Sequence, residues 1–181
     1  GQNLTQLIMK ARNNKEGATI FGYPVNNPKD FGVVEFDDNG KVLSIEEKPS
    51  YPKSNFAVPG LYFYDNKVVE YAKNIKPSAR GELEITSINN CYLEDNKLNV
   101  VLMGRGMAWL DTGTPEGMLK ASQFVQTVQE RQGFYISCLE EIAWRRGFID
   151  DQQLKENGLK LKMTDYGQYL LSLLHEKEGN K

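Results

Sequence analysis

Short apolar runs bounded by turn-forming residues predominate, together with a few helical patterns, as far as residue 113, and only helical patterns follow. The strand-like runs occupy residues 18–23, 31–36, 42–46, 56–64 and 98–103. The helical patterns occupy residues 3–12, 67–73 and 84–93, and later 114–131, 137–146, 150–157 and 164–175. A strand-rich part that also contains helical patterns predicts an α/β fold, because the helices can cover the faces of a sheet.

The change to a purely helical pattern comes at residue 114. Thr114 is a favourable helix N-cap, and Pro115 fits the first helical position because its missing N–H would have no partner there. We therefore expect residues 1–113 to form the α/β part and residues 114–181 to form a helical region. No stretch of flexible composition separates the two.

A β-hairpin is the clearest local prediction. Asn39-Gly40 lies between the strand-like runs 31–36 and 42–46. Asn-Gly is a strong hairpin signal, because both residues tolerate the left-handed backbone that tight turns require.

Composition excludes several classes of function. The net charge is -2, so the chain lacks the basic field of a nucleic-acid-binding protein. No apolar run approaches the roughly 20 residues of a membrane span. Cys91 and Cys138 lack metal-ligand spacing and predict free thiols in a reducing cytoplasm. His175 is the sole histidine and lies in a charged tail, so a histidine-based site is not expected.

Two acidic motifs could carry chemistry. In the run 46–49, Glu47 could accept hydrogen bonds from two sugar hydroxyls while Lys48 faces a phosphate. In the run 109–113, Asp111 follows a buried strand, where open α/β sheets bind ligands, and one carboxylate with substrate phosphates is a normal Mg²⁺ arrangement. The alternatives are a solvated charge cluster at 46–49 and an aspartate that only stabilises its own turn at 111.

Gly32 and Arg80 are weaker candidates. Gly32 opens a strand-like run, where a missing side chain permits close approach of a ligand or marks a bulge. Arg80 precedes an acidic helix start.

The helical region carries a second candidate site. Ile142 lies at helical spacing from Arg145 and Arg146, so an apolar surface adjoins two guanidinium groups. Such a surface suits a nucleotide, with its base on apolar side chains and its phosphates on arginine. The alternative is a helix-packing face with Trp144 in the core.

Together, these motifs resemble bacterial glucose-1-phosphate thymidylyltransferases over essentially the whole chain. The matching runs, in order, are residues 31–37, 46–49, 52–65, 80–86, 109–114 and 140–149. The resemblance implies a Rossmann-like mixed-sheet nucleotidyltransferase fold followed by a helical carboxyl-terminal region. It also implies an Mg²⁺-dependent reaction of dTTP with glucose-1-phosphate, giving dTDP-glucose and pyrophosphate.

The resemblance assigns a role to each candidate residue. Those implied to bind the sugar phosphate are Gly32, Glu47, Lys48, Val58, Tyr62 and Arg80, and Asp111 is implied to bind Mg²⁺. A second site would bind the effector dTDP-rhamnose through Gly1, Glu141, Ile142 and Arg145. The resemblance further implies a cytoplasmic homotetramer in the dTDP-rhamnose pathway that supplies lipopolysaccharide.

The family's catalytic loop has no counterpart in the sequence. The chain opens Gly1-Gln2-Asn3 without a methionine, directly before a helical pattern. The glycine-rich loop with its catalytic arginine and lysine is therefore expected upstream of Gly1. No catalytic residue is assigned here, and the 181-residue chain is expected to be inactive alone.

Two other functions fit part of the pattern. One is a related sugar-1-phosphate nucleotidyltransferase that uses UTP, CTP or GTP. The other is a non-catalytic module that binds a sugar phosphate or supports assembly.

Overall fold

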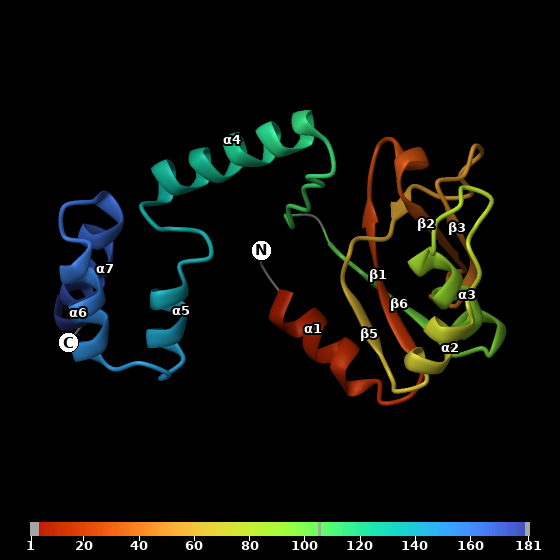
Figure 1. Ribbon diagram of the computed structural model, residues 1–181, viewed down its shortest axis with the longest axis horizontal. Coiled ribbons are helices and arrows are strands. Elements are labelled where there is room, and N and C mark those ends of the chain that lie inside the picture. Colours follow the sequence, from red (N-terminus) through yellow and green to blue (C-terminus); the bar gives the residue numbers. More distant parts are fainter. Residues whose placement is uncertain (1–3, 105, 180–181) are drawn as a thin grey trace. The chain divides into compact units, whose positions relative to one another are not determined.

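The computed structural model describes residues 4–104 and 106–179, and its contacts divide the chain into two units, between Trp109 and Leu110 (Figure 1). The first unit contains α1 (Leu4–Asn13), β1 (Ala18–Pro24), the short 3₁₀ helix η1 (Pro28–Asp30), β2 (Gly32–Phe36), β3 (Val42–Glu47), β4 (Phe56–Ala57), β5 (Tyr62–Tyr64), α2 (Val68–Asn74), α3 (Ile85–Glu94) and β6 (Leu98–Leu102). The second contains α4 (Pro115–Gln132), α5 (Leu139–Arg145), α6 (Asp151–Lys160) and α7 (Asp165–Gly179). None of the described helices is both long and apolar enough to span a membrane.

The sheet of the first unit is mixed, which confirms the predicted α/β class. The strand order is β3-β2-β4-β1-β5, and β6 pairs with β1. The β1–β6 pair is parallel, and the other pairs are antiparallel. The chain passes through α2 and α3 before it reaches β6, in line with the long crossover that parallel pairing with β1 requires.

The prediction of a single strand over residues 56–64 is wrong. β4 pairs with the end of β1 at Tyr23↔Ala57, whereas β5 pairs with its beginning at Ile20↔Tyr62. The four residues 58–61 thus lie opposite only two residues of β1, 21–22. Pro59, which has no N–H to donate to a ladder, lies in this break, so the local backbone chemistry explains the interruption.

Helices cover both faces of this sheet (Figure 1). Successive residues of β1 point to opposite faces, so Ile20 and Phe21 enter different cores although neither is exposed. On one face Phe21 packs with Ala11 of α1. On the other face Ile20 packs with Ile88 and Tyr92 of α3.

The predicted hairpin of β2 and β3 is confirmed, but its turn is longer than two residues. Residues 37–41 connect the strands, and a register shift lies at Glu35/Phe36. Asp37 accepts hydrogen bonds from the backbone N–H groups of Asn39 and Lys41, both at 2.9 Å. Gly40 adopts φ +80°, the left-handed conformation that the Asn-Gly signal anticipates.

The second unit is helical, as the pattern from residue 114 predicts. Thr114 caps α4 by accepting a hydrogen bond from the N–H of Gly117 at 3.0 Å. The helix predicted over 137–146 begins later, at Leu139, because Ser137 has φ +58° and cannot continue a right-handed helix. α5, α6 and α7 enclose a small core around Cys138, Leu154, Leu170 and Leu173.

Asp65 joins three segments of the first unit. Its carboxylate accepts hydrogen bonds from the N–H of Gly17 (2.7 Å), the N–H of Lys67 (3.0 Å) and the hydroxyl of Tyr92 (2.7 Å). These bonds connect the end of β5 with the start of β1, the start of α2 and the last turn of α3. The hydrogen bond from Tyr92, followed by those from the backbone, lowers the pKa of the Asp65 carboxyl below its ordinary value.

We expect Asp65→Asn to lower the free energy of unfolding by about 1–2 kcal/mol at neutral pH, because hydrogen bonds to a charged acceptor are replaced by weaker neutral ones. The pKa of Asp65 is lower in the folded state, so the stability due to its charge is complete above the unfolded-state value and disappears as pH falls below about 4. Urea unfolding at pH 7 and pH 3 should show a gap between wild type and variant that narrows in acid. A gap of equal size at both pH values would contradict this, and Asp38→Asn on the exposed turn serves as the control.

Candidate sugar-phosphate site

The predicted sugar-binding residues of the first unit meet where β2 begins and β3 ends. Gly32 is the first residue of β2, and Glu47 is the last residue of β3 and pairs with it directly. Val58 follows β4, and its N–H donates to the carbonyl of Gly32 at 2.8 Å. The structure therefore brings Gly32, Glu47 and Val58 together.

Gly32 leaves open a small space that is bordered by polar groups. A Cβ atom at this position would lie 3.3 Å from both Glu47 Oε2 and Thr86 Oγ1, and 3.9 Å from Val58 Cβ. Any side chain would therefore crowd the two polar oxygens. The glycine allows a ligand to reach its backbone, which a larger residue would cover.

The Glu47 carboxylate is shared between two partners. Thr86 donates its hydroxyl to Glu47 Oε2 at 2.5 Å, and Arg80 Nη1 lies 3.8 Å from Glu47 Oε1. Thr86 is 5% exposed, whereas the Glu47 side chain is 23% exposed. The carboxylate is therefore held by a buried hydroxyl and remains partly open to solvent. Thr86 was not singled out from the sequence, although it ends the matching run 80–86. The sequence feature that could have identified Thr86 is its position in the first turn of a predicted helix, shortly after Arg80.

Arg80 lies among three carboxylates. Besides Glu47, its guanidinium lies 3.1 Å from Glu82 and 3.4 Å from Glu84. The Arg80 side chain is 41% exposed and carries five N–H donors, so it can exchange exposed acidic partners for a phosphate.

Lys48 is fixed through its backbone. It adopts φ 43°, and its N–H donates to the carbonyl of Phe31 at 3.0 Å. Its side chain is exposed and forms no ion pair within residues 4–104 and 106–179. The ammonium group is therefore available to an anionic ligand.

Tyr62 adds an aromatic wall near Glu47. Its ring is partly buried against the core between the sheet and α3. Burial, and then the negative charge of Glu47, raise the pKa of the Tyr62 phenol. The phenol is therefore neutral at physiological pH and can act as a hydrogen-bond donor.

An aromatic cluster that was not predicted lies at the end of the first unit. Trp109 makes edge contacts with Phe31, at 5.0 Å between ring centroids, and with Tyr23, at 5.6 Å. The Tyr23 hydroxyl donates to the carbonyl of Met107 at 2.9 Å. Phe31 directly precedes Gly32, so this cluster supports one side of the candidate site.

Asp111 belongs to the second unit and stabilises its own turn. Its Oδ2 accepts a hydrogen bond from the N–H of Gly113 at 3.3 Å. No group of three or more His, Cys, Asp or Glu side chains in the described part of the chain could hold a metal ion. One exposed carboxylate with a free oxygen fits Mg²⁺ only as one ligand among several, with phosphate oxygens supplying others.

The predicted effector residues lie on α5. Glu141 Oε1 binds Arg145 Nε at 2.7 Å, and Glu141 Oε2 accepts a hydrogen bond from the hydroxyl of Tyr169 at 2.5 Å. The Arg145 guanidinium lies 5.8 Å from the centre of the Trp144 ring. Ile142 is 48% exposed, whereas Trp144 packs against the core of α5, α6 and α7. Gly1, the fourth predicted effector residue, lies outside the described residues.

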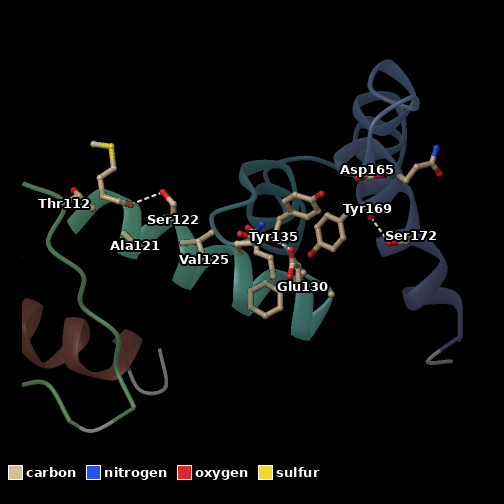
Figure 2. Close-up of a pocket in the computed structure, with 15 residues that line it drawn as sticks. Thr112, Ala121, Ser122, Val125, Glu130, Tyr135, Asp165, Tyr169 and Ser172 are labelled. Atoms are coloured by element: carbon tan, nitrogen blue, oxygen red, sulfur yellow. Dashed lines mark hydrogen bonds between the residues drawn. The ribbon is translucent and has the colours of Figure 1, made fainter. Parts of the chain in front are cut away.

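A separate cavity of about 960 Å³ lies in the second unit (Figure 2). α4, the segment 133–135 and α7 line it, with Val125, Tyr135 and Tyr169 among the lining residues. Its ionisable lining groups are Glu130, Asp165 and the two tyrosines, without any lysine or arginine. Its charge does not suit a nucleotide or a sugar phosphate.

Comparison with known proteins identifies the family. The sequence model of the nucleotidyl transferase family matches residues 1–128. A glucose-1-phosphate thymidylyltransferase of Neisseria meningitidis is 57% identical over 174 residues, which is 96% of this chain and 60% of that protein. The corresponding protein of Mycolicibacterium smegmatis is 56% identical over 158 residues, which is 87% of this chain and 55% of that protein.

A solved structure agrees with these relatives. A Bacillus anthracis protein described as a glucose-1-phosphate thymidylyltransferase, crystallised with sucrose, superposes with a TM-score of 0.60 at 42% identity. The match covers 68% of this chain and 49% of that one. This chain spans about 60% of the length of the curated relatives that it matches most fully. The predicted nucleotidyltransferase fold and the resemblance from the sequence motifs are confirmed, and the chain belongs to the nucleotidyl transferase family.

Proposed function

We propose that this chain forms the sugar-phosphate-binding part of a glucose-1-phosphate thymidylyltransferase, which makes dTDP-glucose and pyrophosphate from glucose-1-phosphate and dTTP. Relatives from Neisseria, Xanthomonas and Mycolicibacterium all carry this name, at 51–57% identity. The single observation in the structure that carries the proposal is the shared Glu47 carboxylate, which lies between Thr86 and Arg80 beside Gly32.

This arrangement suits a hexose 1-phosphate. Glu47 is held by Thr86 but open on one side, so it can accept hydrogen bonds from sugar hydroxyls. The backbone at Gly32 and the side chain of Val58 border the same space, and Tyr62 lies near enough to Glu47 for that charge to raise the pKa of its phenol. Arg80 and Lys48 supply positive charge for the phosphate. A substrate held in this way is positioned for its phosphate oxygen to attack the α-phosphorus of dTTP, a reaction that depends on placement and charge neutralisation.

We propose that Asp111 holds Mg²⁺ together with phosphate oxygens of the substrates. When bound, the ion would neutralise charge that develops on the transferred phosphoryl group. The free Asp111 oxygen supports this role, while the hydrogen bond to Gly113 fixes the orientation of the carboxylate.

We also propose that α5 contributes to an effector site for dTDP-rhamnose in a cytoplasmic homotetramer of the pathway that supplies rhamnose to lipopolysaccharide. Arg145 supports this proposal, because its Nε is held by Glu141 while its outer N–H groups remain available to phosphate. The two free cysteines fit a reducing compartment.

The first test uses a chimaera in which this chain replaces the matching part of the Neisseria meningitidis relative. Glu47→Ala should lower kcat/KM for glucose-1-phosphate roughly 10- to 100-fold, because losing a charged hydrogen-bond acceptor costs about 1.5–3 kcal/mol. The matched control is Glu46→Ala, because Glu46 forms an ion pair with Lys53 at 2.7 Å instead. Equal effects of both variants on dTDP-glucose production would reject the sugar-binding role of Glu47.

The same chimaera tests Asp111. Asp111→Asn keeps the size of the side chain and removes its charge, so turnover should fall at least about 100-fold at limiting Mg²⁺ while glucose-1-phosphate affinity changes little. Near-normal turnover at limiting Mg²⁺ would show that Asp111 is only a turn residue.

The effector proposal is tested by inhibition curves. Arg145→Ala should relieve inhibition by dTDP-rhamnose at least about tenfold and leave uninhibited turnover unchanged, because a charge-assisted contact to phosphate is lost. Arg146→Ala, at the neighbouring exposed arginine, should be inhibited by dTDP-rhamnose as strongly as the unsubstituted protein. An unchanged curve for Arg145→Ala, with the tetramer intact by light scattering, would leave Arg145 as a packing residue.

A further inference from the structure

Asn89 is a fully buried residue whose amide group is only half satisfied. It is 0% exposed, and its Oδ1 accepts a hydrogen bond from the hydroxyl of Tyr64 at 2.7 Å. Its Nδ2 has no hydrogen-bond partner among the described residues. Rotating the amide by half a turn would exchange the two atoms and leave the other one without a partner. A buried donor without an acceptor is destabilising, so an apolar side chain of similar size would suit the core better.

The position of Asn89 connects it with the sugar-phosphate site. It follows Thr86 by three residues on α3, so the two side chains lie on one face of the helix. Thr86 holds Glu47, and Asn89 holds Tyr64. One face of α3 therefore holds both Glu47 of the candidate site and Tyr64, which lies two residues after Tyr62 on β5.

Tyr64 transmits this support to Tyr62 through ring stacking. The two tyrosines alternate along β5 and point to the same face of the sheet. Their rings stack with centroids 5.9 Å apart and planes 15° apart. On its other side, Tyr64 stacks on Tyr92 at 5.5 Å and 20°. The Tyr64 ring is thus held between two rings, and the bond to Asn89 fixes where its hydroxyl end lies.

We propose that Asn89 is a positioning residue of the sugar pocket, which sets the position of the Tyr62 ring through Tyr64. The inference rests on the proposed function, because Tyr62 matters only if its ring borders the sugar. Asn89 has no exposed surface, so its role would be to support Tyr64 rather than to contact a bound sugar. This role explains why a residue with an unsatisfied amide occupies a core position, which packing alone does not.

The test compares wild type with Asn89→Leu in the 181-residue chain. Leucine has a similar size and removes both polar atoms. Three quantities are measured: the urea midpoint of unfolding, the ¹³C-resolved ring signals of Tyr62, and the affinity for glucose-1-phosphate by calorimetry. We expect little change in the midpoint, because the unsatisfied amide donor is removed while the Tyr64 hydroxyl loses its acceptor. We also expect displaced Tyr62 ring signals and an affinity reduced about tenfold, as loosening of a support beneath a binding group produces. A purely structural role of Asn89 would lower the midpoint and leave the Tyr62 signals in place.

A second variant keeps the inference testable if Asn89→Leu does not fold. Tyr64→Phe preserves the ring stack and removes only the hydroxyl, so it should displace the Tyr62 signals in the same way. If Asn89→Leu folds, the double variant Asn89→Leu/Tyr64→Phe should bind glucose-1-phosphate no more weakly than Asn89→Leu alone. Both substitutions break the same hydrogen bond, so their effects should not add. Tyr71→Phe is the control, since the Tyr71 ring contacts Tyr92 and its hydroxyl binds Asp95.

The outcomes separate this inference from the proposed function. If wild type does not bind glucose-1-phosphate but Asn89→Leu displaces the Tyr62 signals, the sugar-binding function is wrong and the positioning role of Asn89 stands. If wild type binds and both Asn89→Leu and Tyr64→Phe leave the affinity and the Tyr62 signals unchanged, the positioning role is overturned.

Discussion

The two-sided pairing of β1 is the constraint on which the first unit depends. Its parallel partner β6 fixes one edge over residues 18–22, and the other edge is divided between β5 and β4. Because this second edge changes partner, residues 58–61 leave the ladder and Val58 comes to lie against Gly32. The same strand separates two cores, with α1 on one face and α3 on the other. A slip of one residue along β1 would exchange these faces and remove the site.

The site itself balances several charges around one carboxylate. The Glu47 carboxylate accepts a hydrogen bond from the Thr86 hydroxyl, lies near the Arg80 guanidinium and remains partly exposed. It is therefore held in one orientation and can still accept hydrogen bonds from a ligand. Arg80 lies among three acids, which hold it near the site but leave it exposed enough to meet a phosphate. With an overall charge of -2, the chain lacks a general attraction for anions. Under the proposed function, binding of a sugar phosphate therefore depends on these few placed groups.

The sequence was sufficient for features that local chemistry determines. The hairpin around Gly40 and the cap at Thr114 follow from backbone preferences of single residues, and the structure has both. The order of the family motifs was sufficient to identify the family. The break between β4 and β5 was missed, because an apolar run with one proline can form one strand or two, and only the partner strand decides.

Contacts between segments that are distant in the sequence could not be predicted from local sequence patterns either. Thr86 lies 39 positions from Glu47 in the sequence, and Asn89 lies 25 positions from Tyr64. Neither residue type is unusual on a helix, so no spacing rule marks either as part of a site. Their roles depend on how α3 packs on the sheet, which is a tertiary property. The candidate residues at Gly32, Glu47 and Val58 could be named from motifs, whereas the groups that hold them required the fold.

Calorimetric titration of the purified 181-residue chain tests most directly whether its first unit is a sugar-phosphate site. Glucose-1-phosphate, glucose and inorganic phosphate are titrated separately under the same buffer and salt conditions. We predict one binding site for glucose-1-phosphate and at least about tenfold weaker binding of glucose and of phosphate, because the Glu47 carboxylate and the Arg80 and Lys48 cations must act together. Binding of inorganic phosphate as tight as that of glucose-1-phosphate, or no binding of glucose-1-phosphate by a folded chain, would contradict it.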